Sequence, residues 1–232
     1  MAWEIFQRSA GEYERWYTTL RGRRADIAER ALLQWLMERV PKARTVLEVG
    51  SGTGHFTDCL AESGFEVIGL DRAPAMVQEA KRRFPSLPFL LGDAHRLPFR
   101  TGAVDVVVFI TTLEFLESAA TALREAVRVA HRGIVAIVLN RHSIGGLSRR
   151  FGPQSRGALL GQARDYSLSR LRRELREAAG DRLDALEWSS TLFPDGFWNC
   201  VAPIPIGNVV GLVGELSTPK IPIEFAARQA IY

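Results

Sequence analysis

Between residues 45 and 140, short apolar runs alternate with segments of helical pattern, and this alternation restricts the fold more than any other feature. The apolar runs are rich in Val, Ile and Leu without polar alternation, as expected of strands buried on both faces. They span 45–50, 65–70, 88–91, 104–110 and 133–140, and the predicted helices between them span 56–63, 73–84 and 119–130. This rhythm favours an α/β fold with a doubly wound, mostly parallel sheet and helices on both faces.

The segments on either side of this alternation are predicted less sharply. Residues 11–40 are expected to form a helix, with Ile27, Ala31, Leu32, Trp35 and Leu36 at helical spacing and Pro41 ending it. Ser167 is a candidate N-cap of a helix that ends at Gly180. The last strands are expected at 186–193 and 221–231, one of them antiparallel, and the stretch between them is predicted to be irregular or partly helical.

Composition excludes several classes of protein. The chain has 232 residues, 47% apolar and 24% charged, which favours one globular domain with its own core. Cys59 and Cys200 are far apart and outside any Cys/His cluster, so we expect neither a disulfide framework nor a metal site, and a reduced, cytoplasmic setting. The sequence lacks both a targeting pattern at its start and an apolar run of about 18 residues, so no membrane span is expected.

The net charge of +4 comes from one segment. Residues 141–180 hold nine Arg against three acidic residues, so the remainder of the chain is slightly negative. Such a segment fits a solvated helix face, and it also fits a surface that faces an acidic substrate, a lipid headgroup or a phosphate backbone.

A glycine-rich turn follows the first predicted strand directly. Gly50, Gly52 and Gly54 allow a close approach of the backbone to a ligand at the start of a helix. The dinucleotide-binding pattern requires a further glycine three residues after the second, where this chain has His55. The spacing therefore disfavours a pyrophosphate site and a nicotinamide-dependent oxidoreductase.

Two acidic residues follow the next two predicted strands. Asp71 lies 17 residues after Gly54, where a carboxylate would accept hydrogen bonds from both hydroxyls of a ribose bound over the turn. Asp93 lies in the run Gly92-Asp93-Ala94-His95-Arg96-Leu97-Pro98-Phe99, in the same predicted crevice, and could accept from an adenine amine.

With this turn and these acids in order, the sequence resembles the class I S-adenosylmethionine-dependent methyltransferases, in particular their small-molecule, type 11-like branch. The resemblance is strong over about residues 44–140 and implies a Rossmann-like sheet, S-adenosylmethionine as cofactor and S-adenosylhomocysteine as product. It implies cofactor contacts at Glu48, Gly50, Ser51, Gly52, Gly54, Asp71, Arg72, Met76, Asp93, Ala94, Phe109 and Thr111. Tyr13, Trp16 and Tyr17 are similar to a lid segment in which an aromatic ring reaches over the cofactor.

The resemblance also implies a division of the single domain, residues 1–232. Residues 1–41 would be an N-terminal helical lid, 42–140 the cofactor-binding core, 141–180 an Arg-rich helical substrate lid, and 181–232 the C-terminal strands. Structural alternatives remain open at this point: the turn could bind no ligand, the two acids could cap helices, Met76 could fill the core, and Trp16 with Tyr17 could pack a helix onto the sheet.

Methyl transfer from a sulfonium needs alignment and exclusion of water more than a catalytic base. Glu114 and His142 are weak candidates for a base, while His55 and His95 are interpreted as structural. The Asn-Pro-Pro-Tyr motif of adenine and glutamine N-methylation is absent after the fourth predicted strand, where Phe109-Ile110-Thr111-Thr112 stands instead.

The favoured hypothesis is methyl transfer to a small-molecule acceptor. The alternatives are an RNA methyltransferase that uses the arginine segment, which the near absence of Lys disfavours, and a non-catalytic protein that binds S-adenosylmethionine. The sequence names neither the acceptor atom nor the oligomeric state.

Overall fold

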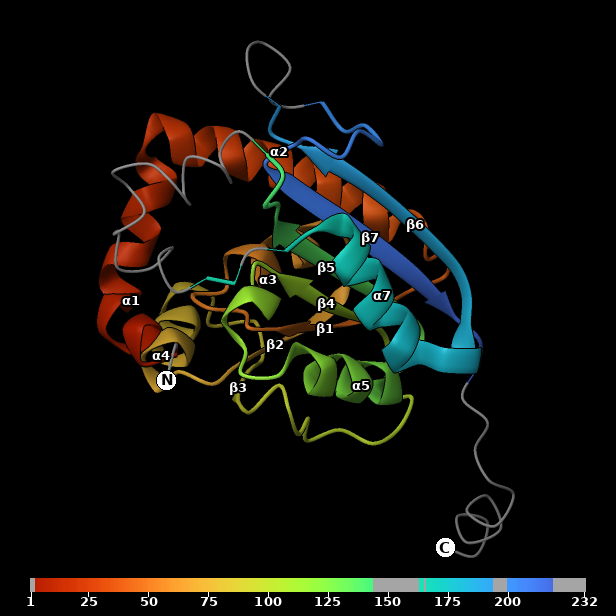
Figure 1. The fold of residues 1–232 in the computed structure, drawn as a ribbon. Coiled ribbons are helices and arrows are strands. Elements are labelled where there is room, and N and C mark those ends of the chain that lie inside the picture. The colour runs from red at the N-terminus through yellow and green to blue at the C-terminus, as the bar shows by residue number, and fades with distance from the viewer. Residues whose placement is uncertain (1–2, 144–162, 165, 194–199, 219–232) are drawn as a thin grey trace, which may run out of the picture.

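The computed structural model describes residues 3–143, 163, 164, 166–193 and 200–218. These residues form a seven-stranded sheet in the order β3-β2-β1-β4-β5-β7-β6, in which β7 runs antiparallel to both of its neighbours and the other described pairings are parallel (Figure 1). The strands are β1 (Thr45–Val49), β2 (Glu66–Asp71), β3 (Phe89–Leu91), β4 (Val104–Ile110), β5 (Ala130–Leu139), β6 (Leu183–Thr191) and β7 (Val209–Leu216). The predicted doubly wound, mostly parallel α/β fold is confirmed.

Helices cover both faces of the sheet, and each face has its own apolar core (Figure 1). One face carries α5 (Ala119–Val129) and α7 (Leu168–Ala179). The other carries α2 (Leu20–Met37) and α3 (His55–Glu62). The remaining described helices are α1 (Trp3–Thr18), α4 (Pro74–Arg83), the 3-10 turn η1 (Leu113–Phe115) and the 3-10 turn η4 (Gly180–Arg182).

Local sequence signals set several of these boundaries. Pro74 is the first residue of α4, where its missing N–H leaves no helical hydrogen bond unmade. The hydroxyl of Ser167 accepts a hydrogen bond from the backbone N–H of Arg170, and Gly180 ends α7. The prediction of a helix between Ser167 and Gly180 is confirmed.

The N-terminal segment differs from the prediction, because it forms two helices rather than one. The chain breaks at Thr19, whose Oγ1 accepts from the backbone N–H of Gly22 at 3.0 Å and so caps α2. The predicted apolar face is also partly wrong: Ile27 is 53% exposed, whereas Glu29 is buried.

The C-terminal part of the sheet corrects a second prediction. Residues 209–216, expected to be irregular, form β7 between β5 and β6. Gly211 and Gly214 give that segment the composition of a loop, but a Cβ there would lie 2.6 Å from Leu36 and 2.8 Å from Leu175. Both glycines thus permit helices to pack closely on this strand. The strand predicted at 221–231 lies outside the described residues.

The second half of the expected Arg-rich substrate lid packs against the sheet. Leu171, Leu175 and Ala179 of α7 are buried in the core shared with α5 and β7. Residues 144–162 of that expected lid lie outside the described residues. Within the described helices, none is long and apolar enough to cross a membrane.

Candidate active site

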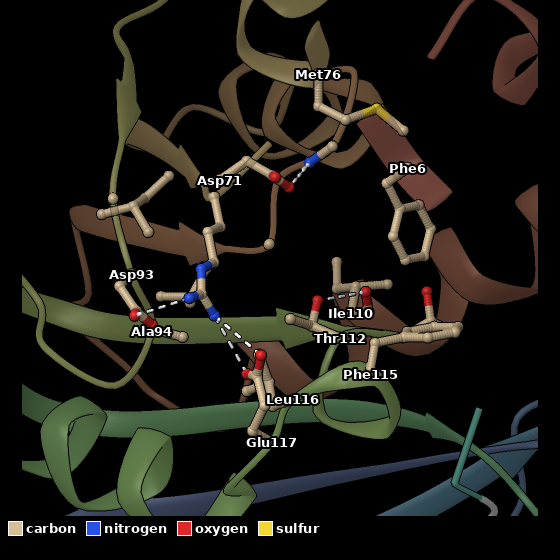
Figure 2. A pocket seen from close by; sticks show the side chains of 17 residues that line it. Phe6, Asp71, Met76, Asp93, Ala94, Ile110, Thr112, Phe115, Leu116 and Glu117 are labelled. Carbon is tan, nitrogen blue, oxygen red and sulfur yellow. Dashed lines mark hydrogen bonds and ion pairs between the residues drawn. The ribbon is translucent and has the colours of Figure 1, made fainter. Parts of the chain in front are cut away.

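A cavity opens where the strand order reverses. β1 pairs with β2 on one side and with β4 on the other, so the loops that follow these strands diverge and leave a crevice at their carboxyl ends. The empty space is about 760 Å³ including its open mouth. It is lined by Phe6, Val49, Gly50, Gly52, Leu70, Asp71, Arg72, Met76, Gly92, Asp93, Ala94, Ile110, Thr111, Thr112, Phe115, Leu116 and Glu117 (Figure 2).

The glycine-rich turn after β1 forms one wall of this cavity. Gly50, Gly52 and Gly54 have positive φ angles of 77°, 53° and 82°, a backbone region that other residues rarely adopt. A Cβ on Gly50 would lie 2.3 Å from the side chain of Thr112, so the turn requires glycine there for space as well as for conformation. Gly50 and Gly52 line the cavity, whereas Gly54 lies against Phe89.

Asp71, the last residue of β2, holds the turn in place. Its Oδ2 accepts from the backbone N–H of Gly52 at 2.8 Å, and its Oδ1 accepts from that of Ala73 at 2.8 Å. Burial raises the pKa of the Asp71 carboxyl above its usual value, against the opposing effect of these hydrogen bonds. The backbone N–H of Arg72 also donates to this carboxyl group, and because a carboxylate has about four acceptor sites, it keeps capacity for one ligand hydroxyl.

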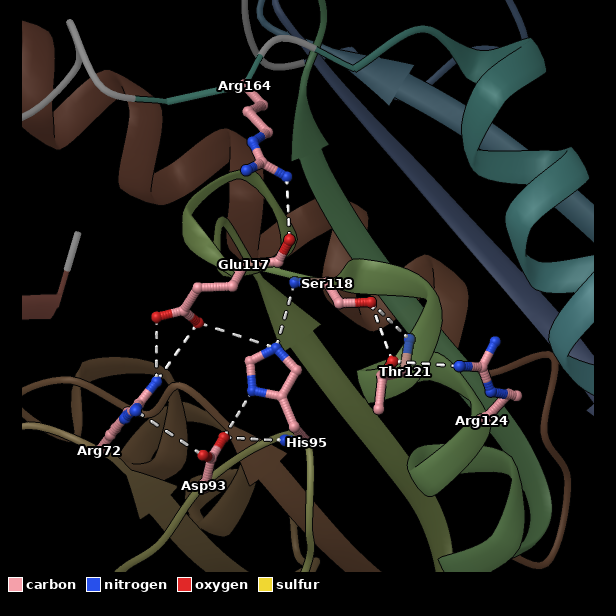
Figure 3. Close-up of polar contacts among 8 residues, drawn as sticks. All are labelled: Arg72, Asp93, His95, Glu117, Ser118, Thr121, Arg124 and Arg164. Carbon is pink, nitrogen blue, oxygen red and sulfur yellow. Dashed lines mark hydrogen bonds and ion pairs between the residues drawn. The ribbon is translucent and has the colours of Figure 1, made fainter. Parts of the chain in front are cut away.

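Asp93 lies at another side of the cavity among charged neighbours (Figure 3). Its Oδ1 accepts from the backbone N–H of His95 at 2.9 Å and lies 2.6 Å from His95 Nδ1. Arg72 reaches from the end of β2, 3.9 Å from Asp93 Oδ2 and 3.1 Å from Oε1 of Glu117. Partial burial acts to raise the pKa of Asp93, but the hydrogen bonds from His95 and the charge of Arg72 outweigh it and lower that pKa.

The tautomer of His95 follows from its neighbours. The backbone N–H of Ser118 donates to His95 Nε2 at 3.2 Å, so Nε2 is an acceptor and the ring proton is assigned to Nδ1, facing Asp93. His95 thus positions Asp93, in agreement with its structural interpretation. His55 likewise binds a neighbouring helix, with its Nε2 2.7 Å from Asp26 Oδ1.

Apolar side chains close the rest of the cavity (Figure 2). Phe6 of α1 packs edge-to-face on Phe115 of η1, with ring centroids 4.9 Å apart, and also contacts the small cluster of Ala73 and Met76. Thr111, directly after β4, has a φ of +46°, a strained angle for a β-branched residue. These residues form an apolar wall opposite the charged groups.

Other residues that the resemblance implicated do not line this cavity. Glu48 is buried beneath the turn, where the Thr57 hydroxyl donates to it, and burial raises its pKa to about 8. Ser51 lies against Gly69, and its buried Oγ has no hydrogen-bond partner among the described atoms. Phe109 is fully buried in the α5-side core, and Ile110 lines the cavity in its place.

The aromatic residues expected in the lid occupy a different place. Tyr17 stacks on His55 with ring centroids 4.0 Å apart, and Trp16 packs edge-on against Tyr17 while remaining 46% exposed. The side chain of Tyr13 lies outside the described part of the chain. Among the described aromatic side chains of α1, Phe6 is the one that lines the cavity.

The two candidate bases are also separated from the cavity lining. Glu114 is 1% exposed, and its Oε1 accepts from the backbone N–H of Leu139 at 2.6 Å. His142 is an exposed residue whose backbone N–H donates to Asn140 Oδ1. Within the part of the chain that the structure describes, no group of acidic, His or Cys side chains could hold a metal ion.

Sequence reasoning missed several lining residues: Phe6, Thr112, Phe115, Leu116 and Glu117. The η1 residues could have been found from their position, since they follow the fourth predicted strand and loops at strand carboxyl ends line such crevices. Phe6 gave no such signal, because its role depends on how α1 folds back over α4.

Comparisons with known proteins agree with this geometry. Residues 47–138 match the methyltransferase domain family model. Over 88 residues the chain is 41% identical to the demethylmenaquinone methyltransferase of Beutenbergia cavernae, covering 38% of this chain and 37% of that one. Over 132 residues it is 31% identical to the malonyl-[acyl-carrier protein] O-methyltransferase of Serratia marcescens, covering 57% and 49%. The matched regions thus span less than half the length of these curated relatives.

Solved structures match nearly the whole chain, among them the following one. It is a SAM-dependent methyltransferase from Thermotoga maritima, described as a possible histamine N-methyltransferase, with a TM-score of 0.79 and 26% identity over 93% of this chain and 99% of that one. The doubly wound sheet in this strand order matches the Rossmann-like methyltransferase fold, with a glycine-rich turn and strand-end acids around one cavity. The match of residues 47–138 and the match to this solved structure support a class I S-adenosylmethionine-dependent methyltransferase.

Proposed function

We propose that this chain transfers a methyl group from S-adenosylmethionine to a small-molecule acceptor, with S-adenosylhomocysteine as the second product. The observation that carries the proposal is the convergence of the Gly50–Gly52 turn, Asp71 and Asp93 on one cavity (Figure 2). The named relatives from Beutenbergia and Serratia support a small-molecule acceptor rather than a nucleic acid. In α7, moreover, Arg170 pairs with Glu174 and Arg173 with Glu177, so two of the segment's arginines already have acidic partners.

The residues present fit this cofactor. Asp71 keeps acceptor capacity for a ribose hydroxyl, and Asp93 with the backbone of Ala94 would accept from and donate to an adenine edge. Gly50 and Gly52 leave backbone free to approach an amino-acid group. Arg72 and Met76 would border the adenine, and Thr111 would lie near the methyl group. Glu48, Ser51 and Gly54 support the turn from behind.

The cofactor supplies a methyl group on a sulfonium, which leaves as a neutral thioether. The chain's own work is therefore to position two reactants and to exclude water, which can supply about 7–11 kcal/mol. Phe6 and Phe115 provide an apolar cover, in keeping with an N-terminal lid over residues 1–41. The proposal uses no residue as a catalytic base, and its expected compartment is the cytoplasm.

Calorimetric titration with S-adenosylmethionine and S-adenosylhomocysteine tests the cofactor. Wild-type protein should bind both saturably, and Asp71→Ala should weaken binding about 100-fold, since hydrogen bonds to a charged group contribute roughly 1.5–3 kcal/mol each. Because Asp71 also holds the backbone of Gly52 and Ala73, Asp71→Asn serves as a milder variant that keeps one acceptor oxygen. It should weaken binding by about tenfold.

Glu66→Gln is the matched control, since Glu66 is an exposed acid at the opposite end of the same strand. It should bind the cofactor as the wild type does. Release of S-adenosylhomocysteine in the presence of a panel of metabolites then tests turnover. Equal affinity of wild type and Asp71→Ala, with both folded by circular dichroism, would refute the proposed site.

A further inference from the structure

One side chain of α1 reaches the glycine-rich turn from outside the cavity. Oε1 of Glu14 accepts a hydrogen bond from the hydroxyl of Thr53. The same oxygen lies 2.7 Å from Nη1 of Arg83, the last residue of α4, and that nitrogen donates to the backbone carbonyl of Thr53 at 3.1 Å. Thr53 is 1% exposed. Two helices and the turn, which are far apart in the sequence, thus meet at one buried threonine.

These contacts hold the turn on the side that faces α1. On the other side, the backbone N–H groups of Gly50 and Gly52 donate to acceptors at the end of β2. Gly52 and Gly54, which flank Thr53, both have positive φ angles, and glycine restricts the backbone less than any other residue. The side-chain contacts of Thr53 therefore fix a segment whose own sequence leaves its conformation free.

We infer that Glu14 is a positioning residue for the amino-acid end of the cofactor. The inference rests on the proposed function, in which the backbone of Gly50 and Gly52 approaches that end. Glu14 is not part of the cavity lining, so it acts through Thr53, which holds the adjacent Gly52 where it lines the cavity. Without Glu14 the turn is free to adopt other conformations, and a ligand that contacts it must order it at a cost in affinity.

A second contact between α1 and α4, which lie side by side, provides an internal comparison (Figure 1). Oε1 of Gln7 accepts from the backbone N–H of Ala75, in the first turn of α4, at 3.0 Å. This contact lies next to Met76, at the adenine border of the proposed site, and does not involve the turn. If α1 served only as a cover, loss of either contact would affect every part of the cofactor alike. A positioning role of Glu14 instead predicts a selective loss at the amino-acid end.

The test compares two ligands that share an adenosine thioether and differ in the amino-acid group, S-adenosylhomocysteine and methylthioadenosine. Calorimetry measures the binding of each to the full chain. Glu14→Ala should weaken the binding of S-adenosylhomocysteine about tenfold and that of methylthioadenosine less than about twofold. Thr53→Val, which has no hydroxyl to donate, should show the same selectivity. Because the two residues act through one contact, the double variant should lose no more than about twofold beyond either single variant.

Glu14→Gln keeps an acceptor oxygen for Thr53 and should hold the affinity for S-adenosylhomocysteine within about threefold of the wild type. Gln7→Ala is the control, and it should change the two affinities by the same factor. Circular dichroism checks that each variant is folded, and Thr53→Val carries the comparison if Glu14→Ala does not fold. Equal losses for the two ligands, or wild-type affinity for both, would overturn the inference and leave the proposed function standing. Failure of the wild type to bind either ligand would refute the proposed function and the inference with it.

Discussion

The structure holds acidic groups differently at the edge of the cavity and in the interior behind it. At the Asp93 end, formed by Arg72, Asp93, His95 and Glu117, each carboxylate lies beside a cation or a hydrogen-bond donor of the protein (Figure 3). At the other end, which we call the Glu114 end, Glu29 and Glu114 lie behind the cavity lining and are only 6% and 1% exposed.

This difference separates two uses of charge. Arg72 and Glu117 are about one third and one half exposed, so their pairing adds little to stability and mainly shapes the mouth of the cavity. Glu29 is buried with no cation or hydrogen-bond donor beside it among the described residues, and a replacement there should make the fold more stable.

The largest effect we expect is on the pH dependence of stability at the Glu114 end. In the unfolded chain Glu29 ionises near the usual glutamate pKa of 4.5, whereas in the folded chain burial holds its pKa at about 8. The contribution of Glu29 to the free energy of unfolding is therefore fully present below about pH 4.5 and is lost as the pH rises through about 8. Relative to Glu29→Gln, the wild type should lose roughly 1 kcal/mol of unfolding free energy per pH unit in that window.

Urea denaturation at about pH 5, 6.5 and 8 measures this difference. Glu48, whose pKa burial also raises to about 8, remains in both proteins and cancels in the comparison. Glu38→Gln, which changes an exposed acid at the end of the same helix, should follow the wild type at every pH. Parallel curves for wild type and Glu29→Gln would show that Glu29 is ionised in the folded protein and would contradict this prediction.

A smaller effect is expected at the apolar wall between the two ends. Phe6→Ala removes the edge-to-face contact with Phe115 and opens the cavity to water. Such a ring pair contributes about 0.5–1.5 kcal/mol, so the affinity for S-adenosylmethionine should fall about tenfold. Trp16→Ala, on the exposed side of α1, should change that affinity by less than about twofold. A larger loss of affinity in Trp16→Ala than in Phe6→Ala would contradict this prediction, because it would show that Trp16 rather than Phe6 covers the cofactor.

The two ends also differ in how far the sequence could predict them. Asp71 and Asp93 can be found because each follows an apolar run, and the carboxyl ends of parallel strands meet at one edge. Glu29 is hidden, because the helical pattern of 11–40 assigns the buried face to Ile27 and its neighbours. The buried face of α2 instead runs through Ala25, Glu29 and Leu32, and packing onto the sheet decides this choice, which a charged residue within the face conceals in the sequence.

The strand pattern shows the same limit. The parallel strands are predicted to within three residues of their observed ends, since continuous Val and Ile runs have few alternatives. The sequence-based prediction misses β7 because its glycines make room for Leu36 and Leu175, which are far away in sequence. Contacts of that kind are properties of the packed fold, so single-sequence reasoning has no access to them.

The smallest effect is expected at the Asp93 end. Glu117→Gln removes a partner of Arg72, but both side chains are partly solvated, so the unfolding free energy should change by less than about 1 kcal/mol. The remaining difference should vanish in about 1 M salt, where the screening length is about 3 Å. Urea denaturation at low and high salt measures both points. The effect of Glu29→Gln should persist in salt, because buried charges are screened much less, and equal salt sensitivity at the two ends would contradict the distinction between them.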